Sequence, residues 1–281
     1  MPVGKTNDLQ GWQHALQRAG KISARLMISL GVGAGLTSGL AGCGMLGDLP
    51  GLRSEKRDGP PLSGQPSLAL ARTALASGAA DLALNASTMI LSRDPGNAAA
   101  HLVQADALTA LGRVQEAQAG YLAALALQPD SIEARIGLGR IALASDAAAA
   151  ERLFLEVLQQ EPRNAVALNN LGIARDLLGR HVEAQAAYRQ AIGLSPAMRA
   201  AQVNLALSLA LSGKASEGAA MLRPLALDQG VSTRMKETIA AVAALAQDPE
   251  TAEALLRTSL NPEQVREALE AYDALRRSTP P

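Results

Sequence analysis

The stretch that decides the fold runs from Asn164 to Pro196 and reads NAVALNNLGIARDLLGRHVEAQAAYRQAIGLSP. In a helix, residues three and four positions apart lie on one face. The first half of the stretch has such a face, made of Leu168, Leu171 and Arg175. Gly179 supplies a turn, and the second half has a face of its own, made of Ala184, Tyr188 and Ala191. Pro196 stops this second helix because proline has no amide hydrogen and disfavours a helical residue before it. The stretch therefore predicts two antiparallel helices joined at a glycine.

The same arrangement recurs about every 34 residues along the chain. Pro95, Pro129 and Pro162 end three earlier units, with steps of 34 and 33 residues between them. The residue missing from the shorter unit falls in its turn, where Ser145-Asp146 replaces the usual glycine. Two later units, around residues 205–222 and 239–256, lack the closing proline and the aromatic residue. The sequence thus predicts six helical hairpins, of which four are clear.

The residues at these positions follow the pattern W-x-x-L-G-x-x-Y … A-x-x-x-F … P, in which Leu168 and Arg175 replace the first two aromatics. In this pattern the chain resembles the tetratricopeptide repeat family. The resemblance implies an all-α fold, a right-handed superhelix (α-solenoid) of about six hairpins with a C-terminal capping helix. It also implies that the first helix of each hairpin lines a concave face that binds a peptide.

Composition agrees with closely packed helices and argues against nucleic-acid binding. The chain is 48% hydrophobic but only 2% aromatic, and its net charge is zero. The repeats contain no basic run and hardly any aromatic residues on which bases could stack. We therefore expect a protein partner and no nucleic acid.

The first 42 residues are typical of a bacterial lipoprotein signal peptide. Lys21 and Arg25 precede an apolar run over residues 26–40, which is short and glycine-rich for a membrane span of about 20 residues. The run ends in Leu40-Ala41-Gly42-Cys43, which matches the lipobox L-[AS]-[GA]-C, and Cys43 is the only cysteine. The alternative is a free thiol beside small residues. The order of charge, apolar run, small residues and cysteine favours lipidation at Cys43.

The resemblance to lipoproteins implies cleavage before Cys43 and acylation of that residue. Several acyl chains make such an anchor effectively permanent. Gly44 stands where an aspartate would favour the inner membrane, so we expect the outer membrane, with the repeats on its periplasmic face. Residues 43–66 are rich in glycine, proline, serine and charge and predict a flexible, lipidated tether. The repeats then occupy residues 67–260.

A capping helix is expected over residues 261–277, because the last repeat would otherwise expose its apolar face. Asn261 is a suitable N-cap and Pro262 a suitable first helical residue. The helix has one apolar stripe, made of Val265, Leu269, Tyr272 and Leu275. This stripe predicts packing on the sixth hairpin.

No catalytic or cofactor motif occurs in the sequence. The three histidines stand apart without the H-E-x-x-H spacing of a zinc site, and neither G-x-S-x-G nor G-x-x-x-x-G-K-[ST] is present. The expectation is therefore a protein that is not an enzyme and that uses no metal, cofactor or small-molecule substrate. The residues expected on the concave, peptide-binding face are Arg72, Asp106, Arg140, Asn169, Asn170, Asp176 and Asn204. An asparagine amide can both donate to and accept from a peptide main chain, but it can equally satisfy neighbouring helices.

Finally, the lipobox, the central repeat and the stretch NLALSLALSG at residues 204–213, followed by LRPLA at 222–226, resemble the TadD lipoproteins of tight-adherence (Flp) pilus assembly. This resemblance implies a pilotin-like assembly factor that delivers a secretin or another pilus component to the outer membrane. The alternative is a general periplasmic scaffold for envelope or secretion-system assembly. A regulatory subunit or an unrecognised enzyme is a third interpretation. Pro224, inside an expected second helix, departs from the ordinary repeat.

Overall fold

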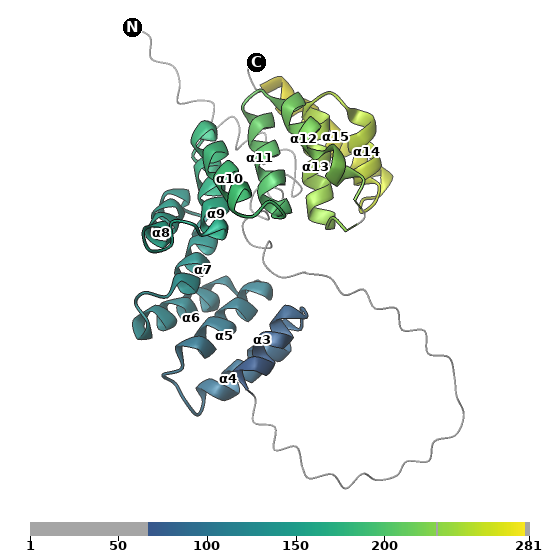
Figure 1. Cartoon of the computed structure of the whole chain (residues 1–281). Helices are drawn as coiled ribbons and strands as arrows, with labels where there is room; N and C mark the ends of the chain where they lie inside the picture. The colour runs from purple at the N-terminus through teal and green to yellow at the C-terminus, as the bar shows by residue number, and fades with distance from the viewer. Residues whose placement is uncertain (1–66, 229, 279–281) are drawn as a thin grey trace, which may run out of the picture. The chain divides into compact units, whose positions relative to one another are not determined.

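The structure is a computed structural model that describes residues 67–228 and 230–278 (Figure 1). Within these residues it contains thirteen α-helices and no strand. The all-helical hairpin fold predicted from the sequence is confirmed. The predicted signal peptide, Cys43 and the predicted tether lie outside the described residues. The helices divide into an N-terminal unit, residues 67–130, and a C-terminal unit, which comprises the described residues from 131 to 278.

The N-terminal unit consists of two hairpins, drawn in blue to teal in Figure 1. Its helices are α3 (Leu68–Ala76), α4 (Ala80–Leu91), α5 (Ala98–Ala110) and α6 (Val114–Leu127). Each helix packs against the next one along the chain. The core between them is small, with Ala71, Ala74, Ala83, Ala86, Val103 and Ala107 buried together. Alanine lets the helix backbones approach closely, and this explains why so few aromatic residues are needed.

The C-terminal unit consists of four hairpins and one further helix. Its first two hairpins are formed by α7 (Ile132–Ala142) with α8 (Ala147–Gln160) and α9 (Ala165–Leu177) with α10 (His181–Leu194). The next two are formed by α11 (Arg199–Leu211) with α12 (Ala215–Ala226) and α13 (Thr233–Leu245) with α14 (Pro249–Leu256). The last helix, α15 (Pro262–Ser278), packs against α13 and α14.

Five of the six hairpin turns contain a residue in the left-handed backbone conformation. Four hairpins have a glycine there with positive φ, namely Gly78, Gly112, Gly179 and Gly213. The hairpin of α7 and α8 has no such residue: Asp146 caps α8, and its Oδ1 accepts from the amide of Ala149 at 2.8 Å. In the sixth hairpin Gln247 occupies the left-handed region with φ 63°. Residues other than glycine are strained in that region because their Cβ approaches the backbone too closely.

Glycine and an aromatic ring form a matched pair in two hairpins. The rings of Phe154 and Tyr188 are 0% and 1% exposed, respectively. A Cβ added to Gly139 would lie 2.6 Å from Cε1 of Phe154, and one added to Gly172 would lie 2.7 Å from Cδ1 of Tyr188. Both distances are far inside van der Waals contact, so only glycine leaves room for the ring against the first helix.

The terminal helix α15 begins with a reciprocal cap. The Oδ1 of Asn261 accepts from the amide of Gln264 at 2.9 Å, and the amide of Asn261 donates to Oε1 of Gln264 at 3.1 Å. This arrangement confirms Asn261 as the N-cap. Val265, Ala268 and Tyr272 are then buried against the core that includes α13 and α14. The helix covers the apolar face of the last hairpin, as the sequence stripe predicts.

Candidate functional site

The three asparagines predicted to bind peptide lie together in the C-terminal unit and are buried. Asn169 and Asn170 on α9 are each 4% exposed, and Asn204 on α11 is 2% exposed. The Nδ2 of Asn204 donates to Oδ1 of Asn169 at 2.9 Å, which links the fourth and fifth hairpins. The Oδ1 of Asn204 has no hydrogen-bond partner among the described residues. A ligand could reach these amides only if neighbouring side chains moved.

Asp176 is the centre of a second polar cluster in the same unit. Its Oδ1 accepts from Ser208 Oγ at 2.7 Å and lies 2.8 Å from His181 Nδ1, and its Oδ2 accepts from the Tyr188 hydroxyl at 2.9 Å. The side chain of Asp176 is only 12% exposed. Burial and then the charge of Asp176 raise the pKa of the Tyr188 hydroxyl well above its usual value. The phenol therefore stays protonated and acts as a donor, so this cluster joins α9, α10 and α11.

A small cleft lies beside these two clusters. Asp176, Tyr188 and Asn204 line it together with four apolar side chains, those of Ile173, Leu177, Leu207 and Leu211. Its volume of about 20 Å³ is enough for about one water molecule. In this conformation the cleft is too small to hold a peptide side chain.

The other predicted residues differ in environment. Arg140, on α7, belongs to the C-terminal unit and is half-buried. Arg72 and Asp106 belong to the N-terminal unit and are exposed on α3 and α5. The carboxylate of Asp106 is nevertheless hydrogen-bonded within the protein, because its Oδ1 accepts from the hydroxyl of Tyr121 at 2.6 Å. Of the seven predicted residues, the structure thus brings together only the group on α9 and α11, and peptide binding by any of them stays a prediction.

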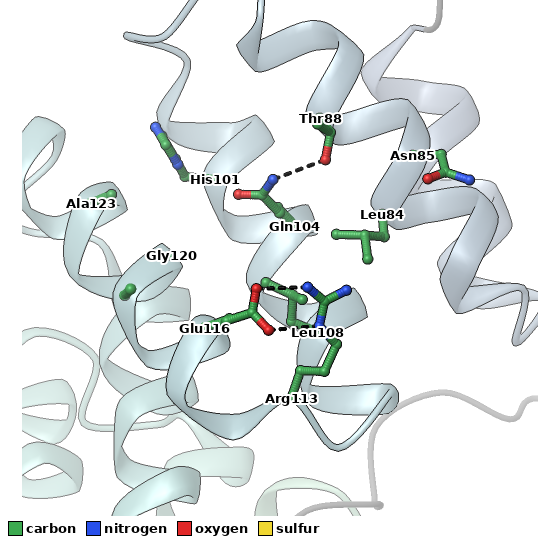
Figure 2. A pocket seen from close by; sticks show the side chains of 11 residues that line it. Leu84, Asn85, Thr88, His101, Gln104, Leu108, Arg113, Glu116, Gly120 and Ala123 are labelled. Atoms are coloured by element: carbon green, nitrogen blue, oxygen red, sulfur yellow. Dashed lines mark hydrogen bonds and ion pairs between the residues drawn. The ribbon is translucent and has the colours of Figure 1, made fainter.

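The N-terminal unit contains an open groove of about 570 Å³ between α4, α5 and α6 (Figure 2). Several of its polar side chains form hydrogen bonds with one another. The Nε2 of Gln104 donates to Thr88 at 3.1 Å. Arg113 donates two hydrogen bonds to the carboxylate of Glu116, at 2.7 and 2.6 Å, and the two charges neutralise each other. This groove therefore offers hydrogen-bonding groups but little net charge.

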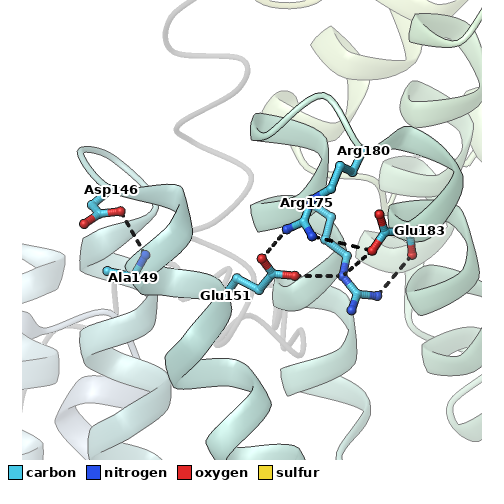
Figure 3. A network of polar contacts seen from close by, with 6 residues as sticks. All are labelled: Asp146, Ala149, Glu151, Arg175, Arg180 and Glu183. Atoms are coloured by element: carbon cyan, nitrogen blue, oxygen red, sulfur yellow. Dashed lines mark hydrogen bonds and ion pairs between the residues drawn. The ribbon is translucent and has the colours of Figure 1, made fainter.

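A network of charged residues joins the third and fourth hairpins (Figure 3). Glu151 on α8 accepts from Nε of Arg175 on α9 at 3.1 Å, and it also forms an ion pair with Arg180 at the start of α10. Glu183 lies within 3.8 Å of both arginines. Burial acts to raise the pKa of Glu151, but the hydrogen bonds from Arg180 and Arg175 outweigh it, so the pKa lies below its usual value. Sequence reasoning missed this network, although Arg175 in place of the usual aromatic was a signal of it.

The described residues show neither a metal centre nor a membrane helix. In residues 67–228 and 230–278, no group of three or more His, Cys, Asp or Glu side chains is placed to hold a metal ion. None of the helices α3 to α15 has the length and apolar content that a membrane crossing requires.

Consecutive helical hairpins, four of them with a glycine turn, pack through alanine-rich crossings, and the second, third and fourth each bury one aromatic ring. These features define an α-helical repeat protein. The particular repeat follows from comparison with known proteins. Residues 74–141 and 153–186 each match a family model described as "Tetratricopeptide repeat". The chain is therefore a tetratricopeptide repeat protein. No curated protein sequence matches it.

Several solved structures have a similar fold. A tetratricopeptide repeat protein from Parabacteroides merdae ATCC 43184 is 18% identical, with a TM-score of 0.61 over 76% of this chain and 86% of its own. PilW, described as a widely conserved type IV pilus biogenesis factor, is 21% identical, with a TM-score of 0.61 over 72% and 96%. Pseudomonas aeruginosa PilF is 18% identical, with a TM-score of 0.57 over 71% and 93%. At these identities the likeness concerns the fold alone.

Proposed function

We propose that this chain is a non-enzymatic scaffold that binds protein partners and is held at the periplasmic face of the outer membrane by lipid on Cys43. The observation that carries the binding role is the tetratricopeptide array itself, because such repeats present grooves between helices and generally serve protein interaction. The anchoring rests on the sequence Leu40-Ala41-Gly42-Cys43. Anchoring and binding together would hold a partner close to the membrane.

The proposed context is the assembly of a tight-adherence (Flp) pilus, in which the chain acts like a pilotin. The sequence resemblance to TadD lipoproteins supports this context. PilW, a type IV pilus biogenesis factor, and PilF share the fold and are compatible with a role in pilus assembly. In the proposed mechanism the repeats hold a segment of the secretin, or of another pilus component, while the acylated end directs it to the outer membrane.

The alternative is a general periplasmic scaffold for envelope or secretion-system assembly. This function uses the same repeats and the same anchor but has a different partner. The tetratricopeptide fold is common to both and does not separate them.

Chemical cross-linking in cells, followed by affinity capture of the full chain and mass spectrometry, distinguishes these proposals. Capture of a secretin or pilus protein supports the pilotin function, and capture of cell-wall enzymes or porin-assembly factors supports the alternative. The matched control is Cys43→Ser. This variant should still bind its partner in extracts but should no longer bring the partner to the outer-membrane fraction. A partner that reaches the outer membrane equally well with Cys43→Ser would refute the pilotin mechanism.

A further inference from the structure

The C-terminal unit has a groove of about 420 Å³ between α12, α13 and α14, away from the predicted asparagines. Its floor is formed by Leu222 and Ile239, which are 1% and 2% exposed. Small side chains line it as well, among them Ala219, Ala220 and Ala243. The buried apolar residues bordered by alanines give the groove an apolar lining, in which an apolar side chain of a partner could be buried.

The helix on one side of this groove has a main-chain acceptor without its usual donor. Pro224 lies inside α12. Because proline has no amide hydrogen, the carbonyl of Ala220, four residues earlier, lacks its helical hydrogen bond. Ala220 is exposed and lines the groove. The carbonyl oxygen of Ala220 is thus without the helical donor that position 224 normally supplies.

A cation in the same groove is not neutralised by a hydrogen-bonded partner. Arg223 is exposed and forms no hydrogen bond and no ion pair within 4 Å with a described residue, although its charge helps to lower the pKa of Asp248, which lines the same groove. Arg113 in the groove of the N-terminal unit differs, because Glu116 holds it in a bidentate pair (Figure 2). Asp248 is the other charged residue in the α12–α14 groove, and its Oδ1 is occupied as the cap of α14, accepting from the amide of Thr251 at 3.1 Å. The guanidinium of Arg223 can therefore take a carboxylate from outside.

An unburied apolar side chain lies beside this cation. Leu227, which follows directly on α12 and lines the groove, is 87% exposed, more than any other large hydrophobic residue in the described chain. A leucine exposed at the edge of this groove, next to an arginine without a hydrogen-bonded partner, can pack against an apolar group of a partner.

We propose that the groove between α12 and α14 binds an extended segment of a partner protein in which an acidic side chain is next to an apolar one. The acidic group pairs with Arg223, the apolar side chain packs against Leu227 and the alanines, and a main-chain amide donates to the carbonyl of Ala220. The proposal rests on the protein-binding role but not on the pilus context.

Selection of a peptide phage library on the immobilised full chain tests the proposal. We expect the selected peptides to contain Asp or Glu beside Leu, Ile, Val or Met. One selected peptide, labelled with fluorescein, is then titrated with each variant by fluorescence polarisation. Arg223→Met should weaken its binding about fivefold, as should Glu→Gln or Asp→Asn in the peptide. The two changes together should cost no more than either alone. Arg113→Met is the matched control in the other groove and should leave the affinity unchanged.

Pro224→Ala separates binding from folding. Alanine restores an amide hydrogen to the carbonyl of Ala220 and removes a helix-breaking residue, so the melting temperature should stay the same or rise while the peptide binds more weakly. A peptide that binds Arg223→Met and Pro224→Ala as tightly as the unmodified chain would overturn the proposal, as would a selection without acidic residues. A dimer in sedimentation that Leu227→Ser dissolves would assign the groove to a second copy instead. Competition by a synthetic peptide of residues 44–66 would assign it to this chain's own tether. If the proposal fails in any of these ways, cross-linking to a partner by the Arg223→Met chain would still support the proposed function.

Discussion

Replacement of Tyr188 and Gly172, separately and together, tests the helix packing on which the repeat depends. The ring of Tyr188 is 1% exposed, and its hydroxyl donates to Asp176 at 2.9 Å. Tyr188→Ala removes the ring and leaves a cavity between α9 and α10, at a cost of about 3–5 kcal/mol in the free energy of unfolding. Tyr188→Phe keeps the ring and loses one hydrogen bond, for about 1 kcal/mol.

Gly172→Ala should lower the free energy of unfolding when residue 188 is Tyr and raise it when residue 188 is Ala. In the unmodified chain the new Cβ would lie 2.7 Å from Cδ1 and Cζ of the ring, and such overpacking costs about 1–3 kcal/mol. In the Tyr188→Ala chain the same methyl group enters empty space. Alanine then stabilises the helix by up to about 1 kcal/mol relative to glycine. The two positions should therefore be coupled by about 2 kcal/mol or more.

Thermal unfolding followed by circular dichroism measures all four chains of this cycle. For a chain of this size, about 1 kcal/mol corresponds to about 2–4 °C in melting temperature. The matched control is Gly193→Ala on α10, where a Cβ would meet nothing within 4 Å. This control should be neutral or stabilising with either residue at position 188. If Gly172→Ala destabilised the chain equally with Tyr and with Ala at position 188, the close packing of glycine against the ring would be refuted.

Three further predictions concern the ion network, a strained turn and the anchor. Because the pKa of Glu151 is lowered from its ordinary value of 4.5, its charged form contributes stability above that pH, and the contribution is lost as the pH falls through the folded-state pKa. The melting temperature of Glu151→Gln should accordingly lie below that of the unmodified chain at pH 7, and the difference should shrink below pH 4.5; a constant difference would contradict this reasoning. Gln247→Gly should raise the free energy of unfolding by up to about 1 kcal/mol by relieving the positive φ, whereas Gly179→Ala, at φ 73°, should lower it; denaturant titration that orders the two the other way would disprove the strain. Cys43→Ser should abolish incorporation of labelled palmitate, and equal labelling of both chains would rule out the lipidated cysteine.

The sequence could predict the hairpins because the signals for them are local. The spacing of Leu168 and Leu171, the glycine turns and the closing prolines each act within a few residues, so helix order and approximate length follow without the tertiary structure. The same reasoning found the cap at Asn261, since a cap depends on the three residues that follow it. The turn conformation of the sixth hairpin could not be predicted in this way. Glutamine does not favour the left-handed conformation that Gln247 adopts.

The candidate site was predicted less completely, because it depends on which residues meet across hairpins. Asn169 and Asn204 were predicted to lie on a peptide-binding face, and the sequence does not reveal that Nδ2 of Asn204 donates to Oδ1 of Asn169 at 2.9 Å. Glu151 gives no sign in the sequence that Arg175 and Arg180, on the next hairpin, will surround it. Pro224 was recognisable as a departure from the repeat, yet its sequence position does not reveal that Ala220, whose carbonyl it leaves without a helical donor, lines a groove with Arg223.

The sequence by itself determined a series of helix pairs and the residues that turn and cap them, because each of these is set by neighbours within a repeat. It also predicts a lipoprotein signal ahead of them, from a short contiguous motif. Only the tertiary structure decided which polar side chains are used inside the protein and which remain available to a partner. Polar side chains become buried and hydrogen-bonded when one hairpin packs on the next. The repeat length along the chain does not reveal which side chains meet across that packing.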